Sequence, residues 1–169
     1  MRVIGIDPGL NGAVALIDNG VLEVESIPVL EVNGKKRLDL QGLASLLRTI
    51  VNKATTVVVE RQQAMTKQGV SSTFRTGFGY GAILGILAAL GAEVQEVRAQ
   101  DWKTDYPTLK GMERRDAKNE ARRLASDYFK DNADSFSRVK DDGRAEAALI
   151  ALAVFKKLVE EKKESSSVA

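Results

Sequence analysis

The chain has 169 residues, and its 25 Lys and Arg against 23 Asp and Glu give a formal net charge of +2. This length predicts one compact domain, and a hydrophobic content of 44% is typical of a globular rather than a disordered protein. Cysteine and histidine are both absent, which excludes disulfides, zinc sites built on Cys or His, thiol nucleophiles and histidine general bases.

From the sequence we expect neither a membrane span nor an export signal. No apolar run approaches the roughly 20 residues that cross a bilayer, and the N-terminal residues lack the charged-then-apolar layout of a signal peptide. We therefore expect a cytoplasmic protein with no membrane contact, in a bacterium or in a cell infected by a virus.

The first part of the chain predicts a three-stranded antiparallel meander. Short apolar patterns over 1–7 and 12–18 indicate two strands separated by turn residues. Asn19 and Gly20 form the preferred pair for a tight hairpin turn, and 21–27 has the pattern of a third strand.

The rest of the chain alternates helical patterns with short β-branched runs. Residues 61–78 are polar and rich in Gly, Ser and Thr, so we expect a loop or the entry to a helix there. The other expected elements, in order, are a helix over 39–52, a strand over 55–60, a helix over 80–90, a strand over 92–97, and helices over 113–129 and 142–157.

This order predicts an α/β fold. A meander followed by strand-helix-strand crossovers gives a mixed sheet of about five strands with helices on both faces. We expect residues 1–158 to form one domain and residues 159–169, which are charged and rich in serine, to form a flexible tail.

Acidic residues stand at the ends of three predicted elements. Asp7 ends the first strand and Glu60 ends the fourth, and the carboxyl ends of adjacent parallel strands face one crevice. Asp142 and Glu146 are four residues apart and share one face of the last helix. Each acid alone is typical of a turn, a strand edge or a helix cap, but their coincidence at element ends predicts one acidic site.

Clustered carboxylates repel one another and raise one another's pKa unless divalent cations neutralise them. Ligation by oxygen alone favours the hard ions Mg²⁺ or Mn²⁺. Two such ions about 3.5–4 Å apart can clamp a phosphodiester during hydrolysis, and this chemistry needs no histidine.

Three segments resemble the acidic motifs of the RuvC family of Holliday-junction resolvases: 3–10 (VIGIDPGL), 57–60 (VVVE) and 142–149 (DGRAEAAL). The resemblance implies a ribonuclease H-like fold and a homodimer that cuts four-way DNA junctions with Mg²⁺ or Mn²⁺ during recombination and repair. It implies that the catalytic metal ligands are Asp7, Glu60, Asp142 and Glu146, with Asp7 bridging the two ions.

The last motif departs from the pattern of cellular members. Those usually place two aspartates three residues apart, whereas Asp142 and Glu146 are four apart, as in viral and mitochondrial members, and Glu146 stands where the family has Asp. Asp141 is a rival ligand; it lies about 140° around a helix from Glu146, so the helical period favours Asp142.

A basic stretch beside Glu60 predicts the DNA-binding rim. From Arg61 to Ala92 the chain has no acidic residue, and a phosphate backbone requires cations, hydroxyls and backbone amides. Aromatic residues and Met65 could wedge between bases at a branch point, although the aromatics equally suit a core or a dimer contact. The candidate DNA contacts are Arg61, Gln63, Met65, Lys67, Ser72, Phe74, Arg75, Lys103, Arg114 and Arg115.

The sequence thus favours a junction-resolving endonuclease, a symmetric dimer in which two active sites nick paired strands. The small-residue helix over 80–90 is a candidate dimer surface. Two alternatives stay open: a ribonuclease H-like nuclease for flaps or RNA–DNA hybrids, and a structure-specific DNA-binding protein without catalysis. An actin-like kinase is excluded, because such chains duplicate the domain and 169 residues leave no room for it.

Overall fold

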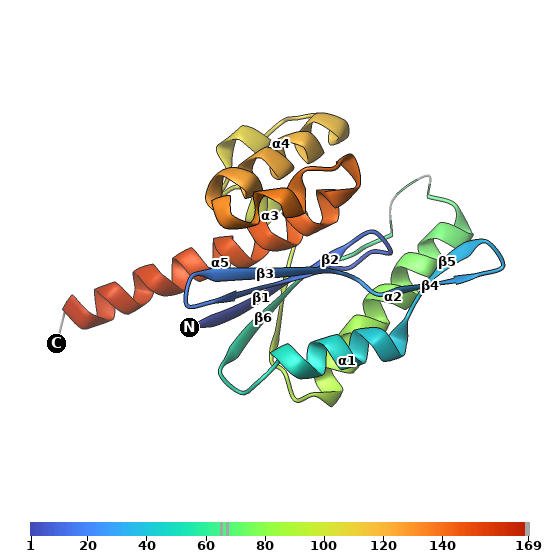
Figure 1. Cartoon of the computed structure of the whole chain (residues 1–169), viewed down its shortest axis with the longest axis horizontal. Helices are drawn as coiled ribbons and strands as arrows, with labels where there is room; N and C mark the ends of the chain where they lie inside the picture. The colour runs from blue at the N-terminus through green and yellow to red at the C-terminus, as the bar shows by residue number, and fades with distance from the viewer. Residues whose placement is uncertain (65, 67, 168–169) are drawn as a thin grey trace.

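A computed structural model describes residues 1–64, 66 and 68–167. A central sheet has helices on both sides, and the C-terminal helix extends well beyond the sheet (Figure 1). In this part of the chain no helix has the length and hydrophobicity that crossing a bilayer requires.

The predicted meander is confirmed. Strands β1 (Arg2–Asp7), β2 (Ala13–Asp18) and β3 (Val21–Ser26) pair antiparallel in sequence order. At the hairpin between β2 and β3, Asn19 and Gly20 have φ of 49° and 93°. Both central residues of a type I′ turn need positive φ, which explains the Asn-Gly pair.

The sheet is mixed and five-stranded, in the order β3-β2-β1-β6-β7. Strands β6 (Thr55–Glu60) and β7 (Val94–Val97) add to it in parallel, β6 directly beside β1. Ile6 pairs with Val59, so β1 and β6 reach their carboxyl ends together. This register is what brings the last residues of the two strands to one edge.

Successive side chains on β1 point to opposite faces, and each face is covered by helices. Ile4 and Ile6 belong to the core beneath α1 (Leu40–Ile50) and α2 (Val70–Ala89). Val3 belongs to the core on the other face, which is covered by α3 (Ala99–Lys103), α4 (Arg114–Tyr128) and α5 (Asp142–Ser167).

Helix α5 crosses the sheet very close to β1. A Cβ added to Gly5 would lie 2.5 Å from both the Ala147 carbonyl oxygen and the Ala151 amide nitrogen. Only a glycine allows this approach, which fixes the height of α5 above the strand that ends in Asp7.

Two segments have more regular structure than the sequence indicated. Residues 29–38 form a second hairpin of β4 (Val29–Val32) and β5 (Lys35–Leu38), turning at Asn33 and Gly34 with φ of 52° and 69°. Helix α2 begins at Val70, ten residues before the expected start, because its run of Gly, Ser and Thr masks the helical pattern.

The end of the chain also differs from the expectation. The last helix, expected to end near 157, continues to Ser167, so residues 159–167 of the expected tail are helical. Glu and Lys are good helix formers, and the hydroxyls of Ser165 and Ser166 donate to carbonyls one turn earlier at 2.8 Å each. The connections around α4 contain three short 3₁₀ helices over Pro107–Leu109, Lys130–Phe136 and Val139–Asp141.

Candidate metal centre

Asp7 and Glu60 end the two central parallel strands, as the sequence predicts. Their strands are paired residue for residue up to Ile6 and Val59. Asp7 is followed by a tight turn in which the Gly9 amide donates to the Asp7 carbonyl at 3.1 Å. The strand ends therefore present both carboxylates at one edge of the sheet.

Helix α5 brings Asp142 and Glu146 to the same edge. The turn after β1 packs against the first residues of the helix, where the Asn11 carbonyl occupies the place that a Cβ of Gly143 would need. A glycine directly after Asp142 thus permits the close contact between the helix start and the turn that follows Asp7.

Neighbouring acids contribute to the raised pKa values of Asp7 and Glu146. The pKa of Asp7 is raised well above its ordinary value, first by desolvation and then by the nearby charges of Glu146 and Glu60. Asp142 raises it further. The pKa of Glu146 is raised for the same reasons, with desolvation as the largest cause.

Two lysines partly compensate this negative charge. Lys118 of α4 forms an ion pair with Asp142, and Lys103 of α3 lies 3.7 Å from Glu146. Both lysines lower the pKa of Glu146, and Lys118 lowers that of Asp7 as well. The pKa of both acids stays raised all the same, chiefly because burial disfavours the charged carboxylate.

The carboxylate of Glu60 has neutral partners. The indole nitrogen of Trp102 donates to Glu60 Oε2 at 2.8 Å, and the Gln62 amide donates to Oε1 at 3.4 Å. Trp102 is buried, with 2% exposure, and packs edge-on against Tyr106. The sequence predicted Lys103 only as a DNA contact and assigned no role to Trp102. Both reach the acids because of the way α3 packs, which no local pattern reveals.

These residues suit a hard divalent cation in chemistry but are not arranged around one. The donors are carboxylates, the oxygen ligands that Mg²⁺ and Mn²⁺ prefer. Burial first, and then neighbouring acids, raise the pKa of Asp7 and Glu146. Among the described residues, however, no group of three or more acidic side chains is spaced to hold an ion. The carboxylates of Glu60, Asp142 and Glu146 instead contact lysine, tryptophan and glutamine side chains.

Asp141 lies outside this cluster, as the helical period indicated. Its carboxylate accepts from the Arg138 amide and guanidinium at 2.8–3.2 Å and caps the short helix before α5. Arg138 lowers its pKa, whereas none of the four clustered acids affects it. Of the two neighbours, it is Asp142 that joins the other three acids.

The residues predicted to contact DNA lie in several places. Arg61 and Gln63 are exposed after β6, Phe74 and Arg75 are exposed on α2, and Ser72 is half-buried there. Arg114 and Arg115 are exposed in the first turn of α4, while Lys103 points into the acidic cluster. Met65 and Lys67 are outside the described residues.

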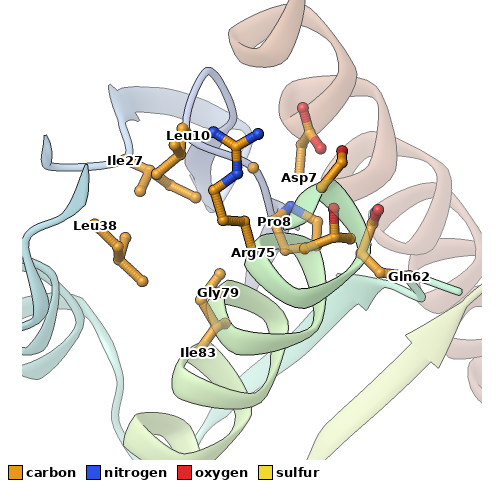
Figure 2. A pocket seen from close by; sticks show the side chains of 12 residues that line it. Asp7, Pro8, Leu10, Ile27, Leu38, Gln62, Arg75, Gly79 and Ile83 are labelled. Carbon is orange, nitrogen blue, oxygen red and sulfur yellow. The ribbon is translucent and has the colours of Figure 1, made fainter. Parts of the chain in front are cut away.

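A cavity of about 270 Å³ adjoins Asp7 (Figure 2). It lies between the turn after β1, the end of β5 and the N-terminal half of α2. Arg75 reaches over it toward Leu10 and Asp7, and Gln62 stands at its edge. This cavity could not be predicted from the sequence, because five segments that are far apart along the chain line it.

Comparisons with known proteins identify the fold. No protein-family model and no curated protein sequence matches the chain. Among solved structures, that of Thermus thermophilus RuvC is similar at 17% identity with a TM-score of 0.57, covering 90% of this chain and 92% of that one. T. thermophilus RuvC in complex with a Holliday-junction substrate is similar at 21% identity and a TM-score of 0.54, covering 90% and 91%. The protein therefore has the RuvC-like fold of the ribonuclease H class, as its acidic motifs predicted.

Proposed function

We propose that this protein is a metal-dependent endonuclease that resolves four-way DNA junctions by paired, symmetric nicks. One observation carries the proposal: Asp7, Glu60, Asp142 and Glu146 come from distant segments, yet the register of β1 with β6 and the close packing of α5 bring those segments together at the carboxyl edge of the sheet. There the charges of the other three acids raise the pKa of Asp7, after burial. The similarity to a RuvC structure solved with a Holliday-junction substrate supports the choice of DNA.

We assign these four carboxylates as ligands of Mg²⁺ or Mn²⁺. Two such ions, when bound, supply an activated water and stabilise the leaving 3′ oxygen of the cut phosphodiester. Asp7 ends the central strand, and the charges of all three other acids raise its pKa, so we assign it as the ligand that both ions would share. Glu60 would be held in place by Trp102 during this chemistry.

The two lysines would change partners when metal binds. Lys118 pairs with Asp142 and Lys103 lies near Glu146. If Asp142 and Glu146 bound metal instead, the ammonium groups of Lys118 and Lys103 would be available to DNA phosphates. Arg61, Arg75, Arg114 and Arg115, together with the polar side chains of Gln63 and Ser72, would extend that phosphate-binding surface.

Helix α2 favours a symmetric dimer. Along one face it exposes Val70, Phe74 and Phe78 to 87%, 73% and 53%. The same face carries Gly77, Gly81 and Gly85, where an added Cβ would meet nothing. A large apolar surface with glycines allows two helices to pack closely, and a two-fold dimer would place two active sites on a junction of matching symmetry.

The test is a comparison of four substrates at equal concentration: a synthetic four-way junction, a flap, a linear duplex and an RNA–DNA hybrid, with Mg²⁺ or Mn²⁺. We expect the junction to be cut fastest, with nicks mapped at symmetric positions on opposite strands. Preferential cutting of flaps or hybrids would favour another nuclease of this fold. Tight junction binding with no cutting in either metal would favour the non-catalytic alternative.

A further inference from the structure

The cavity beside Asp7 has an apolar interior and a polar rim. Leu10, Ile27 and Ile83 form part of its wall, and Ile27 and Ile83 are buried, with 3% and 1% exposure. Asp7, Gln62 and Arg75 stand along its edge (Figure 2). A hollow of this kind suits a flat heterocycle with hydrogen-bonding groups on its edge rather than a phosphate or an ion.

The size of the cavity limits what it can hold. Its volume of about 270 Å³ lies just below the range of about 300–1,000 Å³ for pockets that enclose drug-sized ligands. It has room for one ring system, but not for two stacked nucleotides. Since Asp7 is shared between the cavity and the acidic cluster, a ring bound there belongs to a nucleotide next to the phosphate that is cut.

We propose that this cavity receives one unpaired nucleobase of the cleaved DNA strand, directly adjacent to the cut phosphate. This inference rests on the proposed nuclease function and adds a base-binding subsite to it. The apolar wall covers the faces of the base, as aliphatic side chains do in pockets that bind extruded bases. Arg75 lies at the rim, where it meets the phosphate of the same nucleotide.

Two contacts support this division of roles. The only hydrogen bond recorded from the Arg75 guanidinium within the described part of the chain goes to the Ser71 carbonyl at 3.3 Å, and no ion pair there involves Arg75. Gln62 lines the cavity and donates to Glu60 at 3.4 Å. An edge contact between Gln62 and the base would therefore act directly on a carboxylate of the acidic cluster.

The cavity would make cutting depend on branched structure. A base in an intact duplex must lose its stacking and pairing before it can enter, whereas a base at a branch point has already lost part of both. Only a nucleotide at or next to a branch enters at low cost. The subsite thus accounts for a preference for junctions over linear duplex without any reading of base sequence.

Gly79 allows the cavity to be filled without disturbing the helix. It lines the cavity, and an added Cβ would meet nothing within 4 Å. In Gly79→Leu the leucine side chain occupies the cavity, and leucine has a higher helix propensity than glycine. Gly79→Ala is the matched control, because it makes the same backbone change but adds one methyl group. Leu38→Phe fills the cavity from the opposite wall and serves if Gly79→Leu fails to fold.

The first readout is the single-turnover cutting rate on junctions in which one nucleotide near the cut is replaced by an abasic analogue. For the natural protein and Gly79→Ala, we expect an abasic site at one position to slow cutting about tenfold, the effect of losing one stacked base. Gly79→Leu should cut both junctions at the slower rate. Equal rates at every abasic position for the natural protein, or discrimination retained by both filling variants, would overturn the proposal.

The second readout does not require cutting. A junction carrying 2-aminopurine at the sensitive position is bound by the Asp7→Asn variant, and the fluorescence of the base reports its unstacking. We expect a severalfold rise that is lost when Gly79→Leu is added. A rise in fluorescence without any cutting by the natural protein would support binding of a base in the cavity and contradict the nuclease proposal. Normal cutting without a rise in fluorescence would contradict only the proposal that a base binds in the cavity.

Discussion

The indole nitrogen of Trp102 donates a hydrogen bond to Glu60 Oε2 at 2.8 Å. Trp102 stacks edge-on against Tyr106, whose hydroxyl donates to the Leu149 carbonyl of α5 at 2.7 Å. One buried aromatic pair therefore connects the acid at the end of β6 to the helix that carries Asp142 and Glu146.

Replacing Trp102 by Phe should weaken metal binding rather than folding. The ring still fills its site, but Glu60 loses the donor that orients it, and loss of such a partner typically costs 10–100-fold in metal affinity or activity. We expect the Mn²⁺ concentration for half-maximal cutting to rise by about this factor. Tyr106→Phe, which loses only the bond to Leu149, is the control and should keep the natural Mn²⁺ requirement. Identical Mn²⁺ requirements for the Trp102→Phe variant and the natural protein would contradict the assigned role.

Asp7→Asn should stabilise the metal-free protein at neutral pH. The folded-state pKa of Asp7 is raised above its ordinary value of 3.8 by desolvation and by Glu146 and Glu60. The folded protein therefore holds this proton more tightly than the unfolded chain, and stability declines as the pH rises from 3.8 through the raised pKa. The uncharged asparagine avoids this loss.

The prediction is checked by urea unfolding in the presence of a chelator at a series of pH values. Below pH 3.8 the two proteins should differ little, and the advantage of Asp7→Asn should grow with pH and then level off. Added Mn²⁺ should stabilise the natural protein more than the variant. A variant that is less stable than the natural protein at pH 7 would show that the acidic cluster is not strained by its charge.

Removing the exposed phenylalanines of α2 should dissociate the proposed dimer. Phe74 and Phe78 are 73% and 53% exposed in the single chain. Replacing both by Ser removes most of the apolar area that a second copy would cover. Light scattering after size-exclusion chromatography should report a dimer for the natural protein and a monomer for the variant. Val21→Ser, at a 67% exposed position on β3, should leave the dimer intact. A natural protein that is monomeric at high concentration refutes the assignment.

The sheet was predictable because its signals are local. Alternating apolar residues and one Asn-Gly pair specify β1 to β3, and the β-branched run at 55–60 specifies a strand buried on both faces. The same Asn-Gly signal recurs at Asn33 and Gly34, where the charged flanks of β4 and β5 hid a second hairpin. Polar strands on a protruding hairpin need no apolar alternation, so the pattern was missing there.

The acids of the candidate site were also predictable, since they stand at the ends of elements whose order fixes their edge of the sheet. Their partners were not. Lys118, Lys103 and Trp102 come from α4 and α3, helices that share one hydrophobic core with α5. Contacts of this kind depend on how helices dock, and no short stretch of sequence encodes that.

The most direct measurement is the Mn²⁺-dependent cutting of a four-way junction by five single variants. Asp7→Asn, Glu60→Gln, Asp142→Asn and Glu146→Gln each remove one proposed ligand, whereas Asp141→Asn alters the neighbouring acid that caps a helix with Arg138. We expect each of the first four to slow cutting by at least about a hundredfold while junction binding persists, and Asp141→Asn to cut at nearly the natural rate. Normal cutting by any of the four, or loss of cutting only in Asp141→Asn, would contradict the account.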